Sequence, residues 1–128
     1  MRAIVLTLLA AHTATALPAQ SIAVPDRPER VLSAGGAVLR GLDKTAGTSR
    51  EIKLATGESA MIGNLRVTLG DCRYPEDNPA AEAYAWIEVD DTRADTRLFA
   101  GWMVASSPAL SALDHARYDL WVLSCATS

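Results

Sequence analysis

Histidine and cysteine are scarce in this sequence, and their scarcity excludes the commonest metal sites. The chain has two histidines and two cysteines, and His12 lies in a segment that we expect to be removed. Zinc and copper sites are built largely from histidine and cysteine side chains. His115 and an oxidised cysteine pair cannot form one. The carboxylates do not cluster at ligand spacing and no cofactor motif is present, so we expect no metal and no cofactor.

An excess of basic residues is also lacking. The sequence has 12 lysine and arginine residues against 15 acidic ones, with no basic run or stripe. Proteins that bind nucleic acid or anionic membrane surfaces usually present a concentrated positive patch. The charge pattern therefore argues against both kinds of partner.

Long apolar runs are limited to one, residues 3–11 (AIVLTLLAA), which is shorter than the roughly 20 residues that span a bilayer. This run follows Arg2 and precedes the small residues Ala14-Thr15-Ala16, the order of a secretory signal peptide. We expect cleavage after Ala16, or alternatively after Ala19, and export to the periplasm. A buried N-terminal helix or a retained anchor is the other interpretation. No integral membrane segment is expected after cleavage.

The region after the expected cleavage site is rich in proline and charge. Residues 17–34 hold three prolines, and such a segment can neither continue a helix nor bury much apolar surface. Gly35-Gly36 follows as a hinge. We therefore expect three parts: a signal peptide at 1–16, a flexible tail at 17–36 and a single β-rich domain at 37–128.

The two cysteines, Cys72 and Cys125, both fall in this domain. Two thiols in an exported chain usually pair, whereas a redox pair favours the close CxxC spacing that is absent here. We expect one structural disulfide. Closing so long a loop stabilises the fold by up to about 4 kcal/mol.

Alternating apolar and polar residues predict a mainly β domain. In residues 65–69 the alternation is clear, and Gly70 interrupts it, which predicts a bulge that turns Cys72 inward. A serine cap and Pro108 predict one short helix over residues 106–113. The remaining pattern predicts a small antiparallel β-sandwich or barrel, with strands at 38–43, 50–54, 60–62, 65–69, 83–90, 97–105 and 118–125.

Three motif segments stand out: Gly41-Leu42-Asp43-Lys44, the strand from Gly63 to Cys72, and a closing run. The closing run comprises Gly101-Trp102-Met103, Ser106-Ser107-Pro108-Ala109-Leu110, Asp114-His115, Tyr118-Asp119, Trp121 and Cys125. In these segments the chain resembles the bacterial exported proteins of the domain-of-unknown-function family numbered 2155, from about residue 37 to residue 125. Ala116 stands where that family usually has proline, and Val104 where it tends to have phenylalanine. The resemblance implies export and a conserved domain, and it implies no activity.

Two enzymatic hypotheses arise from the polar residues. Ser106 or Ser107 with His115 and Asp119 would make a small hydrolase, since a serine nucleophile needs a base and the base needs a carboxylate. No GxSxG elbow surrounds either serine, and a serine before a proline is also an ordinary helix cap.

Glycoside cleavage needs two carboxylates, for which Glu88 with Asp90 or Asp91 is the candidate pair. These residues end a strand beside a charged turn, where a solvated turn is the simpler interpretation.

The third hypothesis is recognition by aromatic side chains. Tyr84 and Trp86 share a strand face with Glu88, so we expect Trp86 to be exposed. The same parity places Trp121 with Cys125 in the core, and Trp102 in the core as well. The candidate surface comprises Tyr84, Trp86, Trp102, Met103 and Tyr118. The sequence favours a non-enzymatic interaction or accessory module that binds an envelope protein or glycan, with the hydrolase as the alternative.

Overall fold

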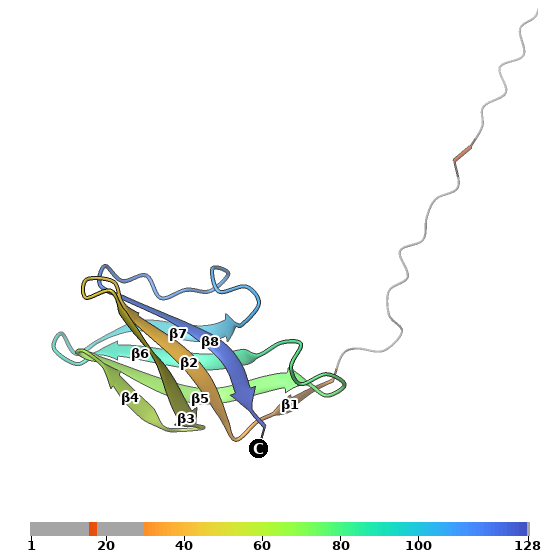
Figure 1. The fold of residues 1–128 in the computed structure, drawn as a ribbon, viewed down its shortest axis with the longest axis horizontal. Helices are drawn as coiled ribbons and strands as arrows, with labels where there is room; N and C mark the ends of the chain where they lie inside the picture. The colour runs from red at the N-terminus through yellow and green to blue at the C-terminus, as the bar shows by residue number, and fades with distance from the viewer. Residues whose placement is uncertain (1–15, 18–29, 128) are drawn as a thin grey trace, which may run out of the picture.

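The structure, a computed structural model, describes residues 16–17 and 30–127, and strands dominate the second range (Figure 1). The signal peptide and most of the tail that the sequence predicts lie outside these residues. The strands are β1 (Val31–Ser33), β2 (Gly36–Asp43), β3 (Thr48–Ala55), β4 (Ser59–Ile62), β5 (Leu65–Pro75), β6 (Tyr84–Asp91), β7 (Thr96–Val104) and β8 (Tyr118–Ala126). The prediction of a mainly β fold is confirmed.

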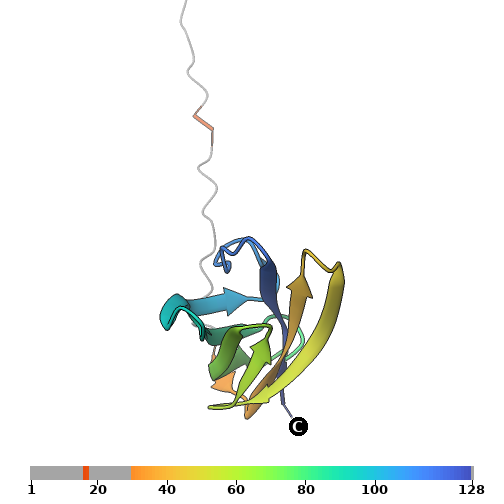
Figure 2. The same cartoon turned by 90° about the vertical axis from the view of Figure 1, so that its left-hand side faces the viewer.

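The strands form two antiparallel sheets that pack face to face, as Figure 2 shows. The five-stranded sheet has the order β1-β5-β6-β7, and β4 pairs with the first half of β5 on the same edge as β1. The three-stranded sheet has the order β3-β2-β8. The last residues of the predicted tail thus contribute strand β1 to a sheet.

The core lies between the sheets and is made by alternate residues of each strand. The fully buried side chains on β5 are those of Leu65, Val67 and Leu69. On β6 they are those of Ala85, Ile87 and Val89. No polar or charged residue is buried among the described residues. Removal of this apolar surface from water is the main force that holds the sheets together.

A disulfide between Cys72 on β5 and Cys125 on β8 links the two sheets, with an S–S distance of 2.07 Å. Each cysteine follows a β-bulge that changes which side chains face inward. Gly70 is the extra residue on β5, because Leu69 pairs with Ile87 while Asp71 pairs with Trp86. The bulge predicted at Gly70 is therefore confirmed.

The short helix predicted over residues 106–113 is not found; the segment between β7 and β8 is made of turns and bends. Only isolated turn bonds form, such as that from the Leu110 amide to the Ser107 carbonyl (3.0 Å). The Ser106 side chain is bonded to Glu82 and does not cap a helix. In the part of the chain that the structure describes, no helix is long and apolar enough to cross a membrane.

Candidate functional site

The serines of the hydrolase hypothesis are not joined to His115. The Ser106 hydroxyl donates to the Glu82 carboxylate, and the Ser106 amide donates to the same group at 3.0 Å. Burial raises the pKa of the Glu82 carboxyl, but the hydrogen bonds from Ser106 and from the Ala83 and Ala105 amides together outweigh it, so this pKa lies below its ordinary value. The Ser107 amide donates to the Val104 carbonyl. Glu82 thus ties down the segment after β7, a role that sequence analysis missed.

His115 and Asp119 also have structural partners. The Nδ1 atom of His115 accepts the amides of Arg117 (3.0 Å) and Tyr118 (3.1 Å). An imidazole nitrogen that accepts hydrogen bonds carries no proton, so the ring proton lies on Nε2. Asp119 accepts the amide of Leu120 at 2.8 Å. Within the described part of the chain, no hydrogen bond joins the two candidate serines, His115 and Asp119 to one another. The hydrolase alternative is not supported.

The carboxylates proposed for glycoside cleavage are held by neighbouring groups. Arg97 reaches Asp90 at 3.0 Å and Glu88 at 3.4 Å. Asp91 accepts two backbone amides of the turn that follows β6 and the side-chain amide of Asn64. These hydrogen bonds lower the pKa of the Asp91 carboxyl. The three carboxylates therefore brace a strand end and its turn.

Two of the five residues predicted for an interaction surface lie in the core. Met103 is 2% exposed and Tyr118 is 5% exposed, so neither can anchor a partner on the outside. Tyr84, Trp86 and Trp102 are half-buried and lie on the outer face of the five-stranded sheet. The predicted exposure of Trp86 is thus confirmed in part, because its side chain lies on the outer face but is half-buried.

The placement of Trp102 in the core was wrong. Its neighbours Gly101 and Met103 share the other face of β7, and Met103 on that face is buried in the core. Both faces of β7 carry apolar residues, so alternation in the sequence does not distinguish them. A bulge at Leu98, between the pairs Val89–Phe99 and Asp90–Arg97, further shifts the pattern.

The placement of Trp121 in the core was also wrong. The buried residues of β8 are Tyr118, Leu120 and Val122, and Trp121 is half-buried on the opposite face. A bulge at Leu123 reverses the alternation before Cys125, because Leu39 pairs with Val122 while Val38 pairs with Ser124. Counting every second residue back from Cys125 therefore places Trp121 on the wrong face of β8.

The half-buried aromatic residues form a compact cluster on the five-stranded sheet, which we call the aromatic face (Arg73, Tyr84, Trp86 and Trp102). Trp86 and Trp102 are directly opposite each other on β6 and β7. Their ring centroids are 5.5 Å apart and the rings are nearly perpendicular, at 73°, a favourable aromatic geometry. The Arg73 guanidinium lies 4.9 Å above the Trp102 ring, within cation–π range.

The aromatic face is hollowed at its edge. Val31, Arg73, Tyr84 and Trp102 line a depression of about 260 Å³. Trp86 lies over Gly70, where a Cβ would come within 2.6 Å of the indole Cδ1 atom. The bulge glycine that turns Cys72 inward thus also provides the space for Trp86.

At the far end of the sandwich, the first and last motif segments meet. Asp43 accepts the amides of Thr45 and Ala46, each at 3.0 Å, and forms an ion pair with Arg117 at 3.0 Å. Lys44 donates from its ammonium to the carbonyl of His115 at 2.7 Å. Pairing of β2 with β8 brings these distant residues together.

The Asp43–Arg117 contact is electrostatic and solvent-accessible. Hydrogen bonds from Arg117 and from the turn amides hold the pKa of the Asp43 carboxyl below its usual value. The same contact raises the pKa of Arg117. Both groups are therefore charged at neutral pH.

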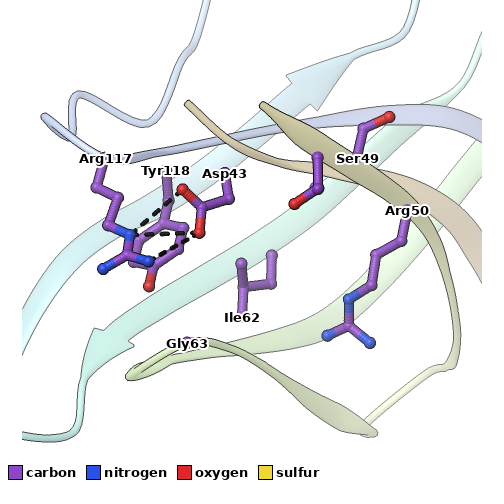
Figure 3. Close-up of a pocket in the computed structure, with 9 residues that line it drawn as sticks. Asp43, Ser49, Arg50, Ile62, Gly63, Arg117 and Tyr118 are labelled. Carbon is purple, nitrogen blue, oxygen red and sulfur yellow. Dashed lines mark hydrogen bonds and ion pairs between the residues drawn. The ribbon is translucent and has the colours of Figure 1, made fainter. Parts of the chain in front are cut away.

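A hollow of about 390 Å³ lies beside this ion pair, and we call it the end pocket (Figure 3). Its lining residues are Gly41, Asp43, Thr48, Ser49, Arg50, Ile62, Gly63, Arg117 and Tyr118. Sequence analysis did not identify this pocket. The signal was present, because Gly41, Asp43, Gly63 and Tyr118 belong to the motif segments, but their convergence depends on strand pairing.

Among the described residues, no group of three or more histidine, cysteine or acidic side chains could hold a metal ion.

We expect Asp43→Asn to lower stability at neutral pH and to have less effect in acid. Because the folded-state pKa lies below the unfolded one, the ionised carboxylate stabilises the fold above about pH 4. This contribution is lost as the pH falls through the folded-state pKa. Urea unfolding of both proteins from pH 7 to pH 3 measures the difference. Asp77→Asn is the control, since Asp77 is exposed and makes no ion pair with the described residues. A difference for Asp43→Asn that does not change with pH would contradict this assignment.

Comparison with known proteins gives two matches. A family described as an uncharacterized protein conserved in bacteria (DUF2155) matches residues 37–125. The uncharacterized protein RP359 of Rickettsia prowazekii (strain Madrid E) is 34% identical over 87 residues, which is 66% of this chain and 56% of that protein. The chain thus spans a little over half the length of this relative. No solved structure matches the chain.

Proposed function

Since the chain belongs to the DUF2155 family of conserved bacterial proteins, we propose that it is an exported, non-enzymatic interaction module of the cell envelope that binds a protein through its aromatic face. The matching family and relative are described as uncharacterized, and neither description names an activity. The separation of Ser106 from His115 by other hydrogen-bond partners agrees with a non-enzymatic role.

Export to the periplasm is supported by two features of the chain. Residues 1–16 have the order of charge, apolar run and small residues that a signal peptide has. The Cys72–Cys125 disulfide is the second, because disulfides form and persist in oxidising compartments. Both features are properties expected of a periplasmic protein.

The observation that carries the binding proposal is the cluster of Trp86, Trp102 and Arg73. Tryptophan, tyrosine and arginine are the residue types that most often dominate the binding energy of protein interfaces. Here they are already packed against each other, so little side-chain entropy would be lost on binding. The Arg73 guanidinium covers one face of the Trp102 ring, so that face is not open for stacking on a sugar, and this favours a protein over a glycan.

The aromatic face also adjoins an open sheet edge. Strand β1 is the outer strand of its sheet, and Val31 and Leu32 are 42% and 43% exposed. Exposed strand edges accept further strands from partner chains. A partner that docks on Trp102 could therefore extend its contact along β1.

We expect Trp102→Ala and Trp86→Ala to abolish capture of the partner, because each removes a central aromatic anchor. The test is crosslinking of the exported protein in periplasm, followed by affinity capture and mass spectrometry. Loss of a hot-spot residue typically weakens binding by at least about 2 kcal/mol, or roughly 30-fold.

Trp121→Ala is the matched control for this experiment. Trp121 is also a half-buried tryptophan on an outer face, but it lies on β8 in the other sheet. A protein that is captured by the wild type and by Trp121→Ala, and lost from both aromatic-face variants, supports the proposal. Equal capture by all four proteins would contradict it, and so would a glycan as the only captured molecule.

A further inference from the structure

The end pocket contains a hydroxyl group that has no hydrogen-bond partner among the described residues. Tyr118 is 5% exposed and lines the pocket, and its hydroxyl makes no hydrogen bond with the described residues. The hydroxyl oxygen is not among the fully buried side-chain atoms that lack a partner in the described part of the chain, so it is accessible from the pocket although the ring is buried. The Tyr118 hydroxyl is thus a donor on the pocket wall that is available to a ligand.

The pocket also contains a positive charge that no acidic side chain neutralises. Arg117 is paired with Asp43, whereas Arg50 donates to the Met61 backbone carbonyl and forms no ion pair within the described part of the chain. A guanidinium has five donors, so most of those of Arg50 remain available. With Arg50, Arg117 and Asp43 as its charged lining residues, the pocket carries one net positive charge.

Between these two polar groups the side chain of Ile62 supplies an apolar part of the wall. Figure 3 shows Ile62 between the Tyr118 side and Arg50. Gly41 leaves space here, since a Cβ at this position would come within 2.8 Å of the Ile62 Cδ1 atom. The volume of about 390 Å³ falls within the range of small-molecule sites, about 300–1,000 Å³.

We infer that the end pocket binds a small carboxylic acid that carries a carbonyl group a few atoms from its carboxylate. The carboxylate pairs with Arg50, the intervening apolar atoms lie over Ile62, and the carbonyl oxygen accepts the Tyr118 hydroxyl. Such a ligand is either the carboxyl end of a peptide or a free oxo acid. One net positive charge suits a carboxylate, which carries a single charge, better than a doubly charged phosphate.

This site is independent of the aromatic face. The end pocket lies at the β2–β3 and β4–β5 turns, while β1 and the hollow beside Trp102 lie at the opposite end of the sandwich (Figure 1). If the aromatic-face variants still capture the partner, the proposed function fails but the inference about the end pocket stands. If the end pocket binds no acid, this inference fails but the proposed function stands.

Titration of the full mature protein by ¹H–¹⁵N NMR tests the inference. The probes are N-acetyl-alanyl-alanine for the peptide end and 4-oxopentanoate for the free acid, with the carboxamide of each and inorganic phosphate as matched controls. We expect saturable shifts of the Gly41, Ser49 and Gly63 amides with at least one acid. The acid that binds more tightly identifies the source of the ligand.

Two variants assign the binding to the named groups. Arg50→Gln and Tyr118→Phe should each weaken binding about tenfold, since each removes a hydrogen bond to the ligand. Arg66→Gln, an exposed arginine outside the pocket, should bind like the wild type. Absence of saturable shifts with both acids would overturn the inference. Equal binding of a carboxamide, tighter binding of phosphate, or unchanged affinity in both variants would overturn it as well.

Discussion

Replacing Cys72 and Cys125 together with alanine should lower the melting temperature by about 15–30 °C. The disulfide closes a sequence separation of 53 residues, and the loop-closure relation gives about 4 kcal/mol for a loop of that length. For a domain of roughly 100 residues, each kcal/mol changes the melting temperature by about 4–8 °C. No strand of one sheet pairs with a strand of the other in the described structure, so the disulfide adds a covalent cross-link between sheets that are otherwise joined by core packing and by the chain connections.

Circular dichroism melts with and without reductant measure this effect. The reduced wild type should melt near the double alanine variant, and reductant should leave the variant unchanged. Cys72 is fully buried, so the disulfide in the folded protein is shielded from reductant. The wild type is therefore unfolded in reductant and refolded in it before the melt. Identical wild-type melts in the two conditions, with reduction verified by thiol labelling, would show that the disulfide does not stabilise the fold.

Gly63→Ala should destabilise the protein by about 2–5 kcal/mol. Gly63 has a positive φ of 57°, and a Cβ there would overlap the Tyr118 hydroxyl and come within 2.5 Å of its Cζ atom. The left-handed backbone costs an alanine about 1–2 kcal/mol, and forcing a buried side chain to move adds about 1–3 kcal/mol. Tyr118 lies in the core, so it cannot move aside without disturbing its neighbours.

Gly47→Ala is the matched control, because Gly47 has a similar φ of 69° and nothing within 4 Å of an added Cβ. It should cost about 1–2 kcal/mol, the backbone contribution alone. Urea unfolding of both variants therefore isolates the contact with Tyr118. Equal losses of unfolding free energy would mean that Gly63 serves only the turn and does not set the position of Tyr118.

The accuracy of the sequence predictions depended on how each strand is patterned. On β5 and β6 one face is apolar and the other mixed, and the alternation recognised in residues 65–69 agrees with the burial of Leu65, Val67 and Leu69. On β7 and β8 apolar residues occur on both faces. Trp102 and Trp121 were therefore placed on the wrong side, since a period of two cannot choose between two apolar faces.

Bulges were predictable only where the residue itself indicates one. Gly70 interrupts a clear alternation and was recognised, whereas the bulges at Leu98 and Leu123 involve an ordinary strand residue. Each bulge reverses the alternation beyond it. The helix predicted over residues 106–113 failed for a different reason, because the serine that would cap it is bonded to Glu82, which lies 24 positions away in sequence.

The sequence by itself determined the class of fold, the half-buried strands with one apolar face and the pair of cysteines, because these depend on local alternation and on residue counts. Only the tertiary structure decided which tryptophans share an outer face and which motif residues surround the end pocket. Asp43 and Arg117 meet across 74 positions of sequence because β2 pairs with β8 in one register. Such registers are selected by the packing of the whole core, which no single segment specifies.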